Sequence, residues 1–379
     1  MTPREQEILY ILKADPLISQ QALADKLGIS RSATASHLAN LVAKGLIQGR
    51  GYILQEPGYC VVVGGANMDI LGRPHKALVA ATSNPGQISV SPGGVGRNIA
   101  DNLARLGAPC YLLAPVGDDA SGEELLELTQ QAGVNTTHMV RLAGQSTSSY
   151  VSLLDSQGDL QLAIADMSIL QAFGVPQLQP LLGLLQGADL VAVDTNLSED
   201  CLAFMFSALT QQCLFVDTVS QAKASRIKPY LSHIHTLKPN LAEAQSIAGM
   251  PADLDPSSQQ LSALANWYHH QGVQRLFVSL GKRGLFYSAH GEGHKTEAFE
   301  MALPSVPVIN VNGAGDAMMA AICYAWTQGL PVHKTCAFAL AAAQLTVSHK
   351  ATINPHMSSM RLQALLQTCD LIQSIKEIT

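Results

Sequence analysis

Apolar residues follow two different periods along the chain after residue 59. Short apolar runs stand at 59–65, 110–117, 188–195, 213–218, 234–239 and 274–281. Between most of them lie segments whose apolar residues recur every three or four positions, such as 96–107 and 122–133. The short runs are typical of buried strands, and the longer segments are typical of amphipathic helices. The alternation predicts an α/β domain whose central sheet is mainly parallel and covered by helices on both faces.

Two regions, about 68–92 and 136–166, depart from this alternation. Residues 146–166 alternate between apolar and polar side chains around a Ser-Gln-Gly-Asp turn at 156–159. This period of two predicts β-hairpins that are exposed on one face. We therefore expect a small β-sheet beside the main sheet, placed as a lid over a cleft.

The first 55 residues have the pattern of a separate helical domain. Ser19 and Ser30 each precede an apolar helical period and are predicted N-caps, with Gly28 between the two helices. Two helices around such a short turn indicate a helix-turn-helix, and residues 45–54 predict a two-stranded wing. The domain boundaries are accordingly predicted at 1–55 and 59–379, with a short linker between them.

Composition narrows the class of protein. The chain has 379 residues, 47% of them hydrophobic and 14% charged, with a formal net charge of −6. Its seven cysteines form no Cys-x-x-Cys pair and lie mostly in apolar runs, which favours reduced, buried thiols. The N-terminus lacks the apolar core of a signal peptide, and no apolar run is long enough to span a membrane. We expect a cytoplasmic protein.

DNA is a candidate partner of the first domain. Residues 1–56 hold six basic and five acidic side chains, a net charge of +1, which provides little attraction for phosphates. The side chains expected to face DNA from the second helix of the motif and from the wing are Arg31, Ser32, Thr34, Ser36, His37 and Arg50. A dimerisation domain, or a remnant without a partner, is the alternative interpretation.

A first glycine cluster lies at 93–96. It matches neither the phosphate-binding Gly-x-x-x-x-Gly-Lys-Ser/Thr motif nor the dinucleotide motif, because Ile99 stands where the latter has its third glycine. Gly93 and Gly94 let the backbone approach a ligand closely, and Asn98 follows in the first turn of the next helix. The cluster therefore predicts a site where an amide binds hydroxyl groups, with an ordinary β-to-α turn as the alternative.

A second cluster, Gly313, Ala314 and Gly315, leads into Asp316 at the start of an apolar helix. A helix N-terminus with free N–H groups attracts anions. An anion site beside a carboxylate is the arrangement that phosphoryl transfer to an alcohol requires, with the carboxylate as proton acceptor. A helix-capping carboxylate is the simpler interpretation of Asp316.

Two further motifs favour the chemical interpretation. Asn240 and Glu243 follow a predicted strand at a spacing that places them on one helical face, and amide and carboxylate oxygens suit a magnesium shell. Ser279, Gly281 and Gly284 end another strand in a turn that can pass close to nucleotide phosphates.

In this order the motifs resemble the ribokinase-like, or PfkB, family of carbohydrate and nucleoside kinases. Residues 93–107 match its first signature and 310–321 its second, while Asn240 and Glu243 match its Asn-x-x-Glu motif. The resemblance implies a three-layer α/β/α fold with a lid, and ATP and Mg²⁺ as cofactors. It implies these roles: Asp316 as base; Gly313, Ala314 and Gly315 as anion hole; Asn240 and Glu243 at magnesium and ATP; Ser279, Gly281 and Gly284 along the nucleotide; Asn67 and Asp69 on sugar hydroxyls.

Segments outside the signatures, such as 84–100 and 147–155, are similar to the pseudouridine kinase subgroup. This implies phosphorylation of a nucleoside 5′-hydroxyl, with Asp69 and Asn98 on the 2′- and 3′-hydroxyls and Asp166 at the base. Val95 stands where ribokinase has lysine, which makes ribose a weaker candidate. The second signature begins Asn-Val-Asn in place of the family's Asp-Thr-x, which leaves dependence on a monovalent cation open. The alternatives are a kinase for inosine or ribose and a ligand-sensing regulator, and we expect a homodimer.

Overall fold

A computed structural model describes residues 2–47, 58–290, 296–302, 306–368 and 375–378. The chain divides into two compact units, Met1–Gly58 and Tyr59–Thr379. No helix in these ranges is both long enough and apolar enough to cross a membrane.

The first unit contains the helices α1 (Pro3–Ala14), α2 (Gln20–Leu27) and α3 (Arg31–Ala43). The predicted N-caps are confirmed: the hydroxyls of Ser19 and Ser30 accept hydrogen bonds of 3.1 Å from the backbone N–H groups of Ala22 and Ala33. Gly28 ends α2 in the left-handed conformation, with φ +63°. The helices enclose a core of Ile8, Leu12, Ile18, Leu23, Leu27, Leu38, Leu41 and Ile47.

The residues of the first unit predicted to face DNA differ in their exposure to solvent. Arg31 and Ser32 are exposed and His37 is half-buried. The prediction for Thr34 is wrong: the side chain is 0% exposed, and its hydroxyl donates to Ser30 O at 3.1 Å, because it lies on the core face of α3. Arg50, together with 48–54 of the predicted wing, lies outside the described residues.

The second unit is built on a sheet of nine described strands, in the order β15-β14-β13-β12-β11-β10-β9-β1-β4. The strands are β1 (Cys60–Val63), β4 (Cys110–Leu113), β9 (Leu190–Asp194), β10 (Leu214–Asp217), β11 (Thr236–Lys238), β12 (Arg275–Ser279), β13 (Leu285–His290), β14 (Thr296–Met301) and β15 (Ile375–Glu377). Strands β4 to β12 of this order run parallel, and β13, β14 and β15 add an antiparallel edge.

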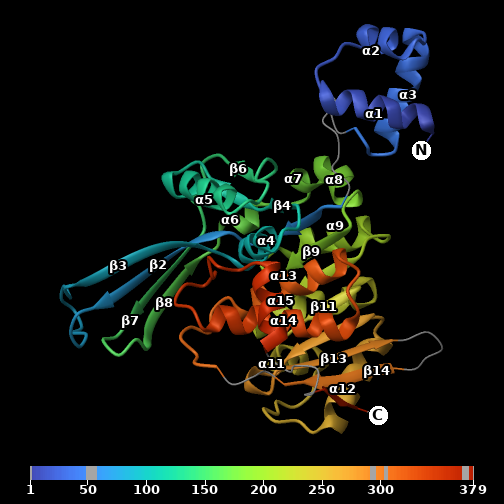
Figure 1. Cartoon of the computed structure of the whole chain (residues 1–379). Helices are drawn as coiled ribbons and strands as arrows, with labels where there is room; N and C mark the ends of the chain where they lie inside the picture. The colour runs from blue at the N-terminus through green and yellow to red at the C-terminus, as the bar shows by residue number, and fades with distance from the viewer. Residues whose placement is uncertain (1, 48–57, 291–295, 303–305, 369–374, 379) are drawn as a thin grey trace. The chain divides into compact units, whose positions relative to one another are not determined.

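Helices cover both faces of this sheet (Figure 1). Val62 of β1 packs into the core beneath α4 (Val95–Leu106), α13 (Ala314–Thr327) and α14 (Val332–Val347). Val61 and Val63 point to the opposite face, into the core with α9 (Glu199–Ala208), α11 (Leu241–Ala248) and α12 (Ser258–His270). This alternation follows from the period of two along a strand, and it confirms the predicted three-layer architecture. The remaining longer helices are α5 (Ala120–Gln131) and α15 (Ser359–Thr368).

The small sheet predicted as a lid is present and has the order β3-β2-β7-β8. Its strands, β2 (Asn67–Pro74), β3 (Gly86–Gly93), β7 (Ser149–Leu154) and β8 (Leu160–Asp166), extend away from the main sheet (Figure 1). The predicted second lid segment, 136–166, starts too early. Within it, β6 (Val140–Leu142) belongs to a separate two-stranded sheet, because its backbone pairs in parallel with β5 (Pro115–Gly117) and not with the lid.

Candidate active site

The carboxyl ends of the parallel strands bring charged residues into one row. Asp217 at the end of β10 is in register with Asp194 at the end of β9 and with Lys238 at the end of β11. The row continues through a bridge between Asn240 and Ser279, which follow β11 and end β12. Residues that are far apart in the sequence therefore share one edge of the sheet, which is where ligands bind in open α/β folds.

A buried ion pair lies in the middle of this row. The Lys238 ammonium, 5% exposed, is 2.7 Å from Asp217 Oδ2 and donates to the carbonyl of Gly315 at 3.1 Å. Burial lowers the pKa of Lys238, but the charge of Asp217, its hydrogen bond with Lys238 and the charges of Asp316 and Glu243 together outweigh this and raise the pKa above its usual value. The ammonium is thus kept charged, and it ties the row of strand ends to the start of α13.

Asp316 lies in the first turn of α13 and faces this row. Its Oδ2 accepts a hydrogen bond of 2.8 Å from the side-chain amide of Asn98, at the start of α4. Burial and the charge of Asp217 raise its pKa to about 7, although Asn98 and Lys238 act in the opposite direction. The N-cap of α13 is Gly313, and among the described residues the hydrogen-bond partner of the Asp316 carboxylate is the Asn98 amide and not a backbone N–H group, so the carboxylate is not used as a helix cap. A carboxyl group with a pKa near neutrality is suited to general-base chemistry.

The glycine turn before Asp316 is shaped for an anion. Gly313 has φ +78°, and a Cβ atom there would lie 2.3 Å from the carbonyl oxygen of Thr352, so a side chain is excluded twice. Ala314 and Gly315 are the first residues of α13, and N–H groups at these positions have no acceptor within a helix. The positive end of the helix dipole adds to their attraction for negative charge.

The first glycine cluster is held in place by Asp194. Its Oδ2 accepts hydrogen bonds from the backbone N–H groups of Gly65, at 2.8 Å, and Gly96, at 2.7 Å. Gly94 has φ +95°, and a Cβ atom there would lie 2.5 Å from the carbonyl of Gly65. Asp194 therefore joins the loop after β1 to the start of α4, which carries Asn98.

Asp69 and Asn67 lie on β2, where the lid leaves the main sheet. The Asn67 amide donates to Asp69 Oδ1 at 2.6 Å, and burial raises the pKa of Asp69. Gly93, which pairs with Asn67 across the lid sheet, leaves room for the Asp69 carboxylate, because a Cβ atom at Gly93 would lie 2.3 Å from Asp69 Oδ2. The predicted sugar-facing residues Asn67, Asp69 and Gly93 thus lie together. Asp166 is exposed at the end of β8 and accepts hydrogen bonds from Ser168.

Asn240 and Glu243 form a reciprocal cap at the start of α11. Asn240 Oδ1 accepts from Glu243 N–H at 2.9 Å, and Glu243 Oε2 accepts from Asn240 N–H at 2.9 Å. The buried hydroxyl of Thr218 also donates to Glu243 Oε2, at 2.6 Å. Both residues are therefore fixed close to Asp217 and Lys238, with hard oxygen atoms of the kind that magnesium prefers.

A cavity of about 790 Å³ lies beside these groups. Ser279, Gly281 and Gly284 line it on one side, and Ala314 and Gly315 on another. Its apolar walls come from Val306, Val308, Val311, Met318, Leu340, Ala343 and Val347. A flat, largely apolar heterocycle with a polar phosphate chain fits this distribution, because the phosphate end would lie toward the N-terminus of α13.

Sequence reasoning missed Asp194, Asp217 and Lys238. Each ends one of three successive apolar runs, and a charged residue at the last position of a buried strand is the signal that would have found them.

The arrangement can be compared with known proteins. The model of the family described as "pfkB family carbohydrate kinase" matches residues 58–359. The chain belongs to this family. It is therefore an ATP-dependent phosphotransferase with a ribokinase-like fold, and its first unit matches a "Winged helix-turn-helix DNA-binding" model over residues 1–48.

Two relatives from Escherichia coli strain K12 are similar over most of the chain. "Uncharacterized sugar kinase YeiI" is 42% identical, covering 95% of this chain and 97% of the relative. "Pseudouridine kinase" is 38% identical, covering 84% of this chain and 100% of the relative. The whole of the second relative thus corresponds to part of this chain.

Solved structures show the same fold. A carbohydrate kinase from Agrobacterium tumefaciens has a TM-score of 0.70 at 27% identity, covering 84% of this chain and 98% of its own. An Arabidopsis thaliana ribokinase complexed with ribose and ATP has a TM-score of 0.69 at 23% identity, covering 82% of this chain and 99% of its own.

Proposed function

We propose that this PfkB kinase transfers the γ-phosphoryl group of ATP to the 5′-hydroxyl of pseudouridine, forming pseudouridine 5′-phosphate and ADP. The observation that carries the transfer is the position of Asp316: a carboxylate with a pKa of about 7, not used as a cap, at a helix N-terminus beside a cavity. The 38% identity to a pseudouridine kinase that this chain covers to its full length supports the acceptor.

In this proposal Asp69 and Asn98 bind the ribose hydroxyls, with Asn67 orienting Asp69. Asn98 then has two tasks, because its amide also donates to Asp316 at 2.8 Å. A ribose bound between Asp69 and Asn98 would have its 5′-oxygen directed toward Asp316. Gly93 and Gly94 allow this close approach because they carry no side chains.

ATP would bind in the cavity, with its phosphates toward Ala314 and Gly315 and its remainder along Ser279, Gly281 and Gly284. Among the residues that the structure describes, no group of three or more His, Cys, Asp and Glu side chains is arranged to hold a metal ion. The oxygen atoms of Glu243, Asn240 and Asp217 fit magnesium held through water and phosphate oxygens. Magnesium in this place would neutralise charge on the phosphate chain.

The chain's own groups would then carry the transfer. Asp316 accepts the proton of the nucleoside 5′-hydroxyl while the 5′-oxygen attacks the γ-phosphorus of ATP. The bond between the γ-phosphorus and the oxygen that bridges it to the β-phosphate breaks, and ADP leaves with that oxygen. The N–H groups of Gly313, Ala314 and Gly315 stabilise the negative charge on the transferring phosphoryl group. The Lys238 ammonium holds Gly315 in place through its carbonyl and contributes positive charge nearby.

The test is a phosphorylation screen with the full chain, Mg-ATP and a panel of pseudouridine, uridine, inosine and ribose, read by ADP release and by mass of the product. We expect pseudouridine to have the highest kcat/KM. If inosine or ribose is turned over preferentially, that compound replaces pseudouridine as the proposed acceptor. If none of the four is phosphorylated, the proposal that the acceptor is a nucleoside or ribose is refuted.

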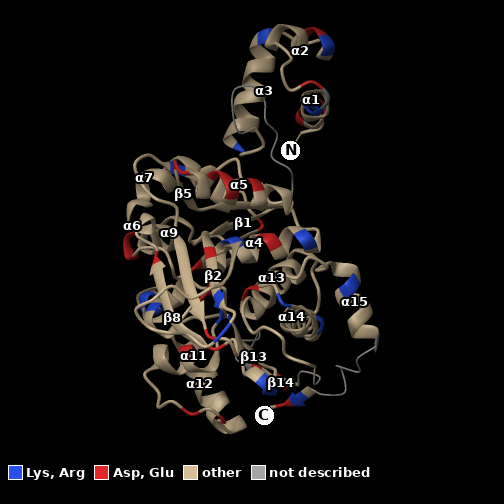
Figure 2. Ribbon diagram, turned by 90° about the vertical axis from the view of Figure 1, so that its left-hand side faces the viewer, with Lys and Arg blue, Asp and Glu red and all other residues tan. Residues whose placement is uncertain are grey.

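We also propose that the first unit binds DNA through α3. Arg31 and Ser32 are exposed on this helix, while Lys44 is paired with Glu5 at 2.7 Å and Arg4 with Glu7 at 2.7 Å. Both signs of charge are spread over its helices (Figure 2). Because two of its basic side chains are already neutralised, we expect weak binding unless two copies act together.

A second copy of the chain is proposed to pack on the outer face of the lid. This face, opposite to the one that carries Asp69, is apolar in two cross-strand rows: Val90, Ile70, Val151 and Ile164, then Ile88, Gly72, Leu153 and Leu162. Ile88 is 76% exposed and Ile164 62%. None of the eight is charged, so an identical face related by a two-fold axis is a suitable partner for sheet-on-sheet packing.

A further inference from the structure

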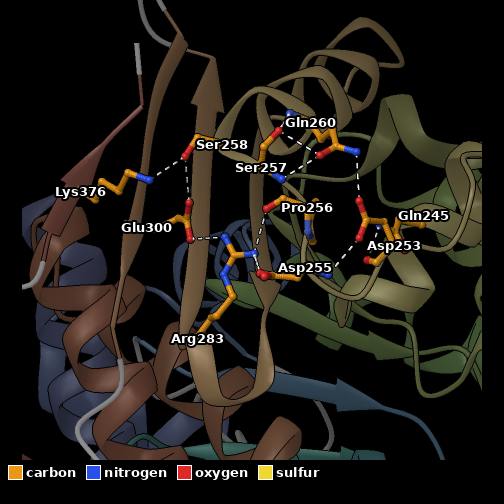
Figure 3. Close-up of polar contacts among 10 residues, drawn as sticks. All are labelled: Gln245, Asp253, Asp255, Pro256, Ser257, Ser258, Gln260, Arg283, Glu300 and Lys376. Carbon is orange, nitrogen blue, oxygen red and sulfur yellow. Dashed lines mark hydrogen bonds and ion pairs between the residues drawn. The ribbon is translucent and has the colours of Figure 1, made fainter.

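Arg283 lies in the turn that borders the nucleotide cavity but does not line it. The neighbouring Gly281, Lys282 and Gly284 do line the cavity. The guanidinium of Arg283 points the other way and makes three contacts: with Glu300 Oε2 at 2.7 Å, Asp255 Oδ1 at 2.6 Å and the carbonyl oxygen of Pro256 at 2.8 Å (Figure 3). One side chain therefore holds the back of the turn from two directions.

The first direction is toward β14. Glu300 is near the end of this strand and is 12% exposed, and the chain then continues to Val306 and Val308, which form another wall of the cavity. Glu300 is supported from its other side by the hydroxyl of Ser258, at 3.3 Å, which accepts a hydrogen bond from Lys376 at 2.9 Å (Figure 3). The Arg283–Glu300 ion pair therefore ties the Gly281–Gly284 turn, which borders the cavity, to β14.

The second direction is toward the loop that follows α11. Its residue Asp253 exchanges two hydrogen bonds with Gln245, of 2.9 and 3.1 Å, and accepts one from Gln260 at 3.0 Å. Gln245 stands on α11, the helix that begins with Asn240 and Glu243. The contacts of Arg283 to Asp255 and Pro256 thus reach, through this loop, the helix proposed to organise magnesium and the ATP phosphates (Figure 3).

We propose that Arg283 is a positioning residue for ATP, which holds the Ser279–Gly284 turn against β14 and against the loop after α11. This rests on the proposed ATP site in the cavity. Arg283 does not touch the nucleotide; it fixes the backbone that does. Its planar group can donate to the Glu300 carboxylate, the Asp255 carboxylate and the Pro256 carbonyl at the same time, which the single ammonium of lysine cannot do in the same geometry.

The two carboxylates that pair with Arg283 differ in their exposure to solvent. Glu300 is 12% exposed, whereas Asp255 is 86% exposed and solvated. An ion pair in water contributes little, and one that is shielded from water leaves a poorly solvated charge behind when it is broken. We therefore expect Arg283 and Glu300 to determine the position of the turn, and Asp255 to serve as the matched control.

The experiment measures Mg-ATP affinity by calorimetry and steady-state kinetics at varied ATP and varied nucleoside, using the full-length chain. For Arg283→Met we expect the Kd and KM for ATP to rise about tenfold, while KM for the nucleoside and kcat at saturating ATP stay within about twofold of wild type. Arg283→Lys should recover part of the loss and Glu300→Gln should show a smaller one, whereas Asp255→Asn should bind ATP normally.

Other outcomes overturn the inference. If Arg283→Met binds ATP as wild type does, or if it weakens both substrates equally while lowering Tm, Arg283 has only a structural role. An Asp255→Asn variant that loses as much ATP affinity as Glu300→Gln would contradict the argument from burial. A wild-type protein that does not bind Mg-ATP would instead refute the proposed ATP site itself. Should Arg283→Met fail to fold, the comparison of Glu300→Gln with Asp255→Asn still decides the question.

Discussion

The substitution Asp316→Asn separates the two interpretations of this carboxylate. The amide has nearly the same shape, and its Oδ1 can still accept the hydrogen bond that Asn98 donates at 2.8 Å. No capping hydrogen bond is lost, because the described hydrogen bond of the Asp316 side chain is with Asn98 and not with the backbone of α13. What disappears is the ability to accept the hydroxyl proton. Loss of a general base lowers the rate by about 10²- to 10⁴-fold, so we expect kcat to fall within this range.

The same substitution should change stability in a direction that depends on pH. A carboxyl group whose pKa is raised from 3.8 to about 7 is destabilised, when ionised, by about 4 kcal/mol in the folded protein. Because the folded state holds this proton more tightly than the unfolded state, wild type loses stability as the pH rises from 3.8 to about 7. Asp316→Asn cannot ionise and escapes this loss. Because Asp316 is partly exposed, we expect a smaller gain, about 1–3 kcal/mol, above neutral pH.

Four measurements test this reasoning. Product formation over time gives kcat; calorimetry with Mg-ATP should show nearly unchanged affinity, because Asn240, Glu243 and the glycine turns are intact. Urea unfolding at pH 5 and pH 8.5 should show a difference between variant and wild type that grows with pH. The kcat/KM of wild type should fall as the pH drops below about 7, since the base becomes protonated. A variant that phosphorylates within tenfold of the wild-type rate would refute the role of Asp316 as base, and one that is less stable at both pH values would refute the argument from its raised pKa.

Three further results are expected. Asp69→Ala removes a charged acceptor for hydroxyl groups, so kcat/KM for the nucleoside should fall roughly 10- to 150-fold, and an unchanged value would exclude Asp69 from the site. Residues 57–379 alone should keep kinase activity and lose DNA binding, whereas the full chain should bind DNA with an affinity that falls steeply with salt; a folded but inactive fragment would contradict the separation of the two units. Ile164→Lys places a charge on the outer face of the lid, so light scattering should show a monomer where the full wild-type chain is a dimer, and an unchanged mass would move the interface elsewhere.

Much of the architecture is determined by local sequence. The apolar runs at 59–65, 188–195 and 213–218 became strands of the main sheet, and Ser19 and Ser30 became helix caps, because period and capping chemistry act within a few residues. The glycine clusters were found for the same reason. A backbone with positive φ or without room for a Cβ atom requires glycine locally, as at Gly94 and Gly313.

Tertiary structure decided what these segments do together. The sequence marks Asp194, Asp217 and Lys238 only as charged residues at the ends of separate apolar strands, and strand register is what places them side by side. The burial of Thr34 depends on which face of α3 packs on the core of the first unit. The start of the second lid segment depends on the pairing of β6 with β5. The pKa of Asp316 has the same origin, because it is set by burial and by the charge of Asp217, which is distant along the chain. Spacing can propose a carboxylate as a base, but its proton affinity is a property of the groups that folding gathers around it.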